Sequence, residues 1–425
     1  MIKKNNKITS FYQRLSKSKD GKRLVKNFGY LSILEATTHL FPLITLPYLG
    51  RVIGVKGFGI LAIGMSVIAY FRSLTTYGFE YSSVRDVAQN RDDVDKISKI
   101  ISKTIFSKAF LMLMSIIALI VCCWFIPFFR ENQVVIWCTF LLIPGTVINT
   151  DWIFQGLEDM RYITMRNLLA KFITTLLIFC LINNRDDYLW QPILQAIGIF
   201  LPSILGIIVL RKKYGIYFKV PPLKEIILYL RDGFNMFITV FLPTVYTNLN
   251  VLLLGSYQGV KATGYYNGGS RFTSLAFSLF KLISRTVYPF FSRRLDRHSL
   301  YVKFSLTLSV AISLFFFIFA RPLVLLLLGP EFEETINVLR IVAFTPIAMS
   351  LMNSYGLNYL VLKKRENIMS RIILITTVFG ILLGMSGAIL FSYIGVAFAS
   401  LITQFIRAGL VTYYARKVAH DETAD

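Results

Sequence analysis

The sequence predicts an all-α integral membrane protein with about twelve transmembrane helices, arranged as two parallel six-helix bundles around a central cavity. Three observations predict this class. The 425-residue chain is 55% hydrophobic, whereas soluble domains contain roughly 45–50% apolar residues. Apolar stretches recur at about the 20-residue length that spans a bilayer. Finally, the run LGRVIGVKGFGILAIG at 49–64 returns as LGSYQGVKATGYYNGG at 254–269, which indicates a duplication.

Charged breaks divide the chain into twelve apolar spans. They cover about 28–50, 57–79, 104–126, 134–156, 163–182, 190–210, 233–256, 263–291, 304–328, 335–362, 372–391 and 394–415. The expected organisation is a basic tail (1–27), a first six-helix bundle (28–215), a linker (216–232), a second six-helix bundle (233–415) and a short tail (416–425).

The basic residues predict how the chain is oriented. The first 27 residues contain nine Lys or Arg and one acid, Asp20, without the pattern of a cleavable signal peptide. Of the 46 Lys and Arg, 32 fall in the tails and the loops on the same side, and five fall on the other side. Cytoplasmic loops of membrane proteins are rich in Lys and Arg. We therefore expect a multi-pass membrane protein with both termini in the cytoplasm.

The repeated run connects span 1 to span 2 and span 7 to span 8. Seven of its sixteen positions match at an offset of 205 residues. Each half then contains six spans, so both halves enter the membrane from the same side. This predicts a parallel repeat with a pseudo-two-fold axis along the membrane normal, as in transporters that bind substrate between two rocking halves. Glycines such as Gly54 and Gly59 suit a tight turn and close helix approach.

Span 8 has one polar face. Its polar residues recur every three or four positions over about 27 Å of helix. They are Asn267, Arg271, Ser274, Ser278, Lys281 and Arg285. Three cations facing lipid are unfavourable, so this stripe should face a cavity or pair internally. The span that follows the first copy of the repeat has one cation, Arg72. This difference suggests that the second half holds more of an anionic cargo.

Other polar residues within the spans leave alternatives open. Arg72 either lines the cavity or reaches the membrane surface, and surface positions are expected for Lys108, Lys171, Arg321, Arg340 and Arg407. Glu35 and His39 lie one turn apart on span 1 and form either a titrating pair or a structural ion pair. Asp151 either neutralises a buried cation, couples to an ion, or belongs to a polar hairpin end. Asn248 belongs to a polar side of span 7.

No cofactor or metal site is expected. The four cysteines lie in apolar segments without zinc or redox spacing. Transport is expected to couple to H⁺, Na⁺ or the membrane potential. Nucleic acid is not an expected partner, because the charge is confined to short loops.

Two segments resemble the polysaccharide transport family, namely ITLPYLGRVIGVKGFGILAIG (44–64) and DWIFQGLEDMRYITMRNLLAKF (151–172). The chain looks like its Wzx-type O-antigen or repeat-unit flippases, within the multidrug/oligosaccharidyl-lipid/polysaccharide exporter superfamily. The resemblance implies two six-helix bundles around a V-shaped alternating-access cavity. It also implies a cargo of lipid-linked oligosaccharide, carried on undecaprenyl diphosphate and moved from the inner to the outer leaflet of the bacterial cytoplasmic (inner) membrane. The partners that it implies are this cargo, membrane lipids and other polysaccharide-assembly membrane proteins.

In related flippases, cations of helices one, two and eight meet the diphosphate. Here the corresponding cations are Arg72, Arg271, Lys281 and Arg285, while span 1 offers Glu35 and His39 instead. Two other functions remain open. A drug/cation antiporter would favour acids in the cavity, but cations within the spans outnumber acids nine to two. A glycan polymerase or ligase would need a larger outer loop.

Overall fold

The structure is a computed structural model that describes residues 19–291, 298–361, 363 and 365–424, and this part of the chain is helical without strands. The helices in chain order are α2 (Lys19–Thr76), α3 (Phe79–Gln89), α4 (Val94–Phe125), α5 (Pro127–Glu131), α6 (Gln133–Phe140), α7 (Leu142–Val147), α8 (Asp151–Gly156), α9 (Met160–Leu181), η2 (Arg185–Leu189), α10 (Trp190–Tyr214), α11 (Leu223–Tyr257), α12 (Gly259–Phe291), α13 (His298–Ile318), α14 (Ala320–Leu327), η4 (Pro330–Phe332), α15 (Thr335–Val342), α16 (Thr345–Leu351), the π-helix η5 (Met352–Val361) and α17 (Glu366–Ala424).

Eight helical runs among the described residues are long and apolar enough to cross a membrane. Two of them, Ser32–Gln89 and Asn367–Ala419, are more than 50 residues long, so each holds two crossings. Within these runs the chain turns at Gly54 (φ 62°) and Ser392 (φ 54°). With α11 and α12 as two further crossings, the fold agrees with the predicted number of about twelve transmembrane helices. The protein is a multi-pass membrane protein.

The repeated run forms equivalent turns in the two halves. Gly54 lies between the two parts of α2 with φ 62°, and its repeat partner Gly259 begins α12 with φ 81°. Only glycine adopts such positive φ values without steric penalty. The two matched glycines therefore have similar backbone conformations, and the tight turn that the sequence predicted at Gly54 is observed.

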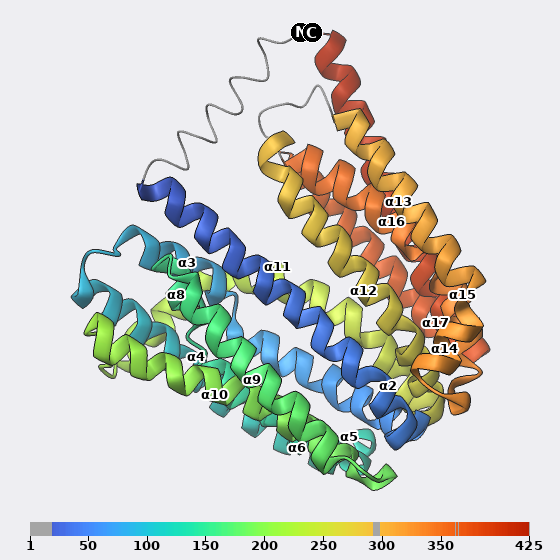
Figure 1. Ribbon diagram of the computed structural model, residues 1–425, viewed down its shortest axis with the longest axis horizontal. Coiled ribbons are helices and arrows are strands. Elements are labelled where there is room, and N and C mark those ends of the chain that lie inside the picture. The colour runs from blue at the N-terminus through green and yellow to red at the C-terminus, as the bar shows by residue number, and fades with distance from the viewer. Residues whose placement is uncertain (1–18, 292–297, 362, 364, 425) are drawn as a thin grey trace.

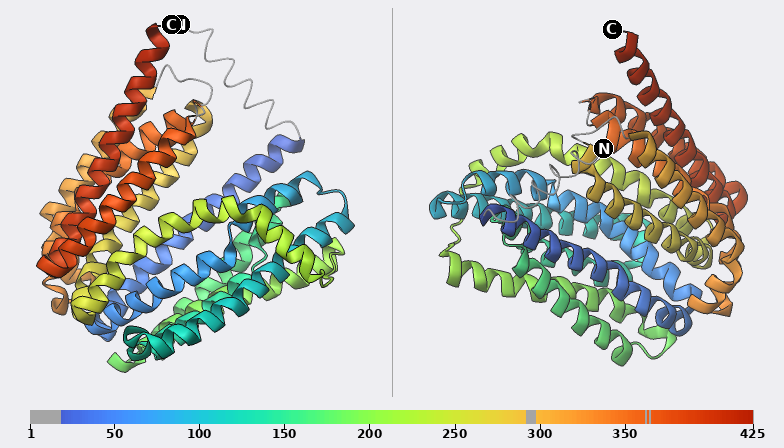
Figure 2. Two further views of the ribbon diagram at one scale, coloured as in Figure 1. Left: turned by 180° about the vertical axis from the view of Figure 1, so that it is seen from behind. Right: turned by 45° about the horizontal axis from the view of Figure 1, so that its top comes forward.

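Figure 1 shows two helical groups that meet near the labels α2, α14 and α5 and spread apart toward the chain termini. We call the meeting region the hairpin end and the opposite region the terminal end. The views of Figure 2 show the same V-shaped arrangement. α11 connects the two groups, because Tyr229 stacks on Phe79 with 4.8 Å between the rings, while the helix also packs on α17.

The hydrophobic cores follow this shape. At the hairpin end, a single cluster joins both halves, and it includes Phe58 of α2 and Phe332 of η4, whose rings lie 5.3 Å apart. Toward the terminal end, each half also has a core of its own. One contains residues of the first half such as Phe154, and another contains residues of the second half such as Val411. The halves thus share one apolar core at the hairpin end, and α11 adds a smaller apolar contact toward the terminal end, where Phe237 stacks on Tyr77 with 4.6 Å between the rings.

The hairpin turns pack directly against each other. A Cβ atom at Gly59 would overlap the backbone carbonyl oxygen of Val260, and a Cβ atom at Gly264 would overlap that of Val55. The offset of 205 residues relates both pairs, so one contact is the two-fold image of the other. Close backbone approach at these glycines closes the hairpin end.

Helix limits differ from the expected domain limits at three places. α2 is already helical at Lys19, within the predicted tail, and α11 begins at Leu223, within the predicted linker. α17 continues to Ala424 through the predicted C-terminal tail. Charged residues do not end a helix by themselves, because a helix can extend beyond the membrane with a polar surface.

Local capping explains other limits. The Asp93 carboxylate accepts a hydrogen bond of 3.0 Å from the backbone N–H of Lys96 at the start of α4. This bond lowers the pKa of Asp93 below its ordinary value. α10 ends at Gly215, which has a left-handed φ of 64°, after three basic residues in its last turn.

Candidate functional site

A cavity of about 630 Å³ lies between α2, α7, α9, α10 and α12. Most of its described lining comes from the first half, and α12 is the part of the second half that contributes. The polar face of α12 packs toward α2, so the first half forms the facing walls. The expectation that the second half holds more of the anionic cargo depends on Lys281 and Arg285, whose side chains lie outside the described residues, so it stays a prediction.

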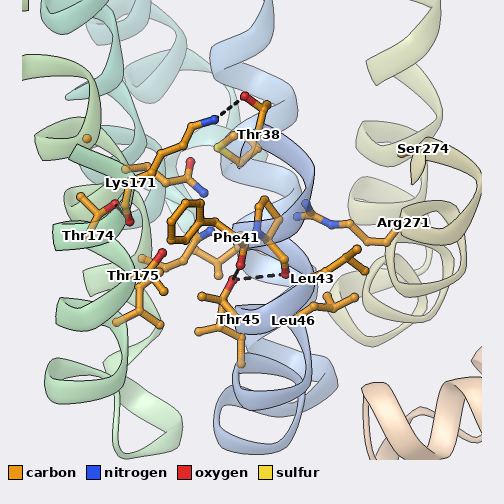
Figure 3. Close-up of a pocket in the computed structure, with 18 of the residues that line it drawn as sticks. Thr38, Phe41, Leu43, Thr45, Leu46, Lys171, Thr174, Thr175, Arg271 and Ser274 are labelled. Atoms are coloured by element: carbon orange, nitrogen blue, oxygen red, sulfur yellow. Dashed lines mark hydrogen bonds between the residues drawn. The ribbon is translucent and has the colours of Figure 1, made fainter. Parts of the chain in front are cut away.

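Three cations from three different crossings line this cavity: Arg72, Lys171 and Arg271. Arg72 and Arg271 are both exposed. The described lining contains no Asp or Glu. In Figure 3, Lys171 reaches toward α2 from α9, and Arg271 reaches toward α2 from α12. The cavity is therefore electropositive and suited to an anionic ligand.

The predicted polar stripe of α12 is partly seen. Asn267, Ser274 and Ser278 line the cavity on the same face as Arg271. The Ser274 and Ser278 hydroxyls donate to carbonyl oxygens four residues earlier, at 2.9 and 3.0 Å. The side chains of Lys281 and Arg285 lie outside the described part of the structure, so their predicted positions remain predictions.

Lys171 was not among the predicted site residues. Its amine donates a hydrogen bond to the Thr38 hydroxyl, which lies on the cavity wall formed by α2. The Glu35 carboxylate, one turn earlier on α2, acts electrostatically on Lys171. Lys171 falls close to a predicted span end, and this position suggested the membrane surface. Its spacing of three and four residues from Thr174 and Thr175 was the available signal for a polar face.

The remaining predicted residues have varied positions. Glu35 lies near the cavity but does not line it, and the side chain of His39 is outside the described residues, so their pairing stays a prediction. Asn248 does not line the cavity either. Its amide donates to the Thr244 carbonyl oxygen of the same helix at 2.9 Å.

Asp151 belongs to a structural network and lies outside the cavity lining. Its carboxylate accepts hydrogen bonds from Arg166 at 3.1 Å and from Asn167 at 2.9 Å. Arg166 is buried and also donates to the Thr150 hydroxyl and the Pro202 carbonyl oxygen. This network joins α8, α9 and α10. Asp151 thus neutralises a buried cation, which was one of the predicted alternatives.

Two other cations expected at the membrane surface are buried. The Lys108 amine is fully buried, has no hydrogen-bond partner among the described residues, and lies 5.8 Å from the centre of the Trp152 ring. Arg407 is also buried and donates to the Thr376 hydroxyl at 2.8 Å. Both predictions were wrong because distance from a span end does not show which helix face packs inward.

Within the described residues, no group of three or more His, Cys, Asp or Glu could hold a metal ion. The cysteines Cys122, Cys123, Cys138 and Cys180 are free thiols. The chemistry of the cavity therefore rests on cationic, amide and hydroxyl groups of the chain itself.

Comparisons with known proteins agree with this geometry. A sequence profile of the family described as "Polysaccharide biosynthesis protein" matches residues 24–295. The chain is 27% identical over 401 residues to the "Putative O-antigen transporter" of Escherichia coli (strain K12), covering 92% of this chain and 97% of the relative. A protein of the same name from Shigella dysenteriae is 27% identical over 362 residues, with 82% and 88% covered.

Solved transporters share the fold. An inward-facing multidrug resistance MATE family transporter of the MOP superfamily aligns with a TM-score of 0.70 at 14% identity, covering 94% of this chain and 100% of that chain. The lipid II flippase MurJ, in an inward closed conformation, aligns with a TM-score of 0.55 at 16% identity, covering 89% and 87%.

The chain thus has the fold of solved membrane transporters, and the relatives that match it along most of its length are named as transporters. The chain belongs to the polysaccharide biosynthesis protein family.

Proposed function

We propose that this protein is a transporter rather than an enzyme, and that it is a flippase for an undecaprenyl-diphosphate-linked oligosaccharide of the O-antigen repeat-unit kind. It moves this lipid from the inner to the outer leaflet of the bacterial cytoplasmic membrane. The observation that carries the proposal is the cavity lined by Arg72, Lys171 and Arg271, with no carboxylate in its described lining. The names of the two O-antigen transporter relatives support the choice of cargo.

The cavity chemistry suits a diphosphate. A diphosphate cannot cross hydrocarbon unaided, because its charge loses hydration there. Arg guanidinium groups offer paired N–H donors to phosphate oxygens, and a Lys amine adds a compact charge. The exposed side chains of Arg72 and Arg271 carry such donors into the cavity. The polyprenyl tail can remain in lipid while the head group enters.

Movement by alternating access agrees with the shape. The two halves share one large apolar core at the hairpin end, whereas toward the terminal end each has a core of its own and the contact between them is the smaller cluster around Tyr77 and Phe237. The distribution of basic residues supports a cytoplasmic terminal end, so this conformation accepts cargo from the inner leaflet. Energy comes from an H⁺ or Na⁺ gradient or from the membrane potential. Glu35 acts electrostatically on Lys171, so it is the candidate residue through which the ion gradient acts on cargo binding.

A drug/cation antiporter has less support, although the fold is shared with MATE transporters. A cationic drug would meet three cations in this cavity and no described carboxylate. Like charges in a confined site repel each other, so an anionic head group is the better match.

A leaflet-accessibility assay in vesicles tests the proposal. Purified protein is reconstituted with a defined undecaprenyl-diphosphate-linked oligosaccharide, with and without an ion gradient or membrane potential. We expect Arg271→Gln to slow translocation about tenfold or more, because it removes charged hydrogen bonds to the diphosphate. Arg340 is exposed and lies outside the cavity lining, so Arg340→Gln is the matched control and should translocate at the parent rate. Parent-like translocation by Arg271→Gln would reject the proposed role of the cavity.

A further inference from the structure

One branch of the cavity, between α2, α9 and α10, carries neutral polar groups beside a single cation. On α9, Lys171 is followed by Thr174 and Thr175, three and four positions later. On α10, Gln191 and Gln195 are four positions apart and also line the cavity. Residues at these spacings share one helix face. The branch is therefore a wall of amides and hydroxyls that begins about one helical turn, or 5 Å, from the Lys171 position.

Close helix packing holds this wall in place. A Cβ atom at Gly198 of α10 would lie 3.3 Å from the methyl carbon of Thr174 on α9. At the hairpin end, the Tyr48 hydroxyl of α2 donates to the Ile182 carbonyl oxygen just after α9, at 2.7 Å. Three helices of one bundle thus form a preorganised surface.

Gln191 carries an unmet hydrogen-bonding requirement. The residue is 9% exposed and lines the cavity, and its Oε1 atom is buried without a donor among the described residues. A buried amide oxygen without a donor is unfavourable by roughly 1–3 kcal/mol. This oxygen is therefore suited to a ligand group that donates a hydrogen bond.

The surroundings restrict what that ligand can be. A polyprenyl chain has no donor, and an ionised diphosphate has only acceptors. A cationic amine could donate, but Lys171 in the same branch repels it. A neutral sugar meets both conditions, because its hydroxyls donate and accept. Phe41 is also drawn between Lys171 and Thr175 in Figure 3 and offers an aromatic face for an apolar sugar face.

We propose that Gln191, Gln195, Thr174 and Thr175, with Phe41 as a platform, form a binding subsite for a neutral sugar of the cargo. The sugar next to the diphosphate occupies it, while Lys171 holds the adjacent phosphate. This inference rests on the proposed flippase function and deepens it. It assigns binding of the charged diphosphate to Arg72, Lys171 and Arg271, and it assigns sugar recognition to the first half of the chain.

A paired binding measurement tests this subsite. Affinities of the reconstituted full-length protein are measured for undecaprenyl diphosphate and for undecaprenyl diphosphate bearing one N-acetylglucosamine. We expect the parent protein to bind the glycosylated probe more tightly. Gln191→Leu should reduce this preference about threefold to tenfold, the value of one lost hydrogen bond. Gln404 lies on α17 outside the cavity lining, so Gln404→Leu should keep the parent preference.

The outcomes separate the two proposals. Arg271→Gln should weaken both probes alike, which reports on the diphosphate site. If it does so while Gln191→Leu leaves the preference unchanged, or if the parent shows no preference, the sugar subsite is rejected and the flippase proposal stands. If the parent binds neither probe, the flippase proposal fails, and the subsite fails with it. Size-exclusion profiles of each variant check that folding is retained.

Discussion

At the residue scale, cations within the membrane spans have different roles according to the partners that they meet. Arg166 is buried with a carboxylate partner, since Asp151 accepts from it at 3.1 Å. Lys171 donates to a hydroxyl on the cavity wall. Lys108 has neither kind of partner among the described residues. A buried cation without an acceptor destabilises a fold. Removing the positive charge should therefore change stability differently at each of these three positions.

The first prediction concerns Lys108. Replacing it by Met keeps the apolar stem and removes an amine that is fully buried. We expect Lys108→Met to raise the free energy of unfolding by about 1–3 kcal/mol, because the desolvated amine is removed. Thermal unfolding of the purified protein in detergent measures this change.

Lys103 provides the matched control on the same helix. It forms an exposed ion pair with Glu225 at 2.8 Å. Exposed ion pairs contribute about 0–1 kcal/mol, so Lys103→Met should change stability little. A loss of stability in Lys108→Met would mean that the amine makes an interaction that stabilises the fold.

At the scale of the element, the repeated hairpins act as one symmetric contact. Gly54 and Gly259 provide the positive φ of the two turns. Gly59 and Gly264 remove the Cβ atoms that would meet the opposite backbone. The glycines that match between the two copies of the repeat thus divide into turn-forming and contact-forming positions, and both kinds are needed to close the hairpin end.

The second prediction follows from the contact-forming pair. Gly59→Ala and Gly264→Ala each place a methyl group against a backbone carbonyl, so we expect the hairpins to separate and the thermal stability to fall by about 1–3 kcal/mol. Gly409 of α17 has open space around its Cβ position. Gly409→Ala is thus the control, and a thermal scan should show no loss. Equal stability of all three variants would mean that the hairpins are not held in contact.

At the scale of the whole molecule, polar contacts accompany the shared core at the hairpin end. Arg185 between α9 and α10 pairs with Glu331 of η4, which belongs to the other half. Arg51 of α2 donates to the Leu326 carbonyl oxygen of α14 at 2.8 Å. These contacts must break if the hairpin end opens, so they set part of the balance between the two conformations.

The third prediction tests this balance. Arg185→Glu replaces an attraction by a repulsion, and we expect it to populate a state opened at the hairpin end. The readout is labelling of a single cysteine at Asn267, in a background without the four native cysteines, by an impermeant thiol reagent applied from that side. Exposed ion pairs are weak, so labelling should rise about twofold to fivefold.

The compensating variant provides the control. Arg185→Glu combined with Glu331→Arg restores opposite charges and should return labelling to the parent level. If the single variant labels like its parent, the ion pair does not contribute to closure. If the double variant stays open, the effect arises from something other than this pair.

The sequence by itself determined the membrane class, the approximate number of crossings and the duplication. These properties depend on local composition and on periodic spacing, and both can be determined without knowledge of tertiary contacts. The same reasoning identified Asn267, Arg271 and the serines of α12 as one polar face, because helical spacing fixes which residues share a side. The structure places these residues on the cavity wall.

Only the tertiary structure decided which helices face each other. It brought Lys171 to Thr38, placed Asp151 against Arg166 outside the cavity, and buried Lys108 although its position near a span end suggested the surface. It also showed that the first half supplies most of the cavity wall. A single sequence specifies the faces of each helix, but the partner of a face is set by packing between different helices, which lie 15 residues apart for Asp151 and Arg166 and 133 apart for Thr38 and Lys171.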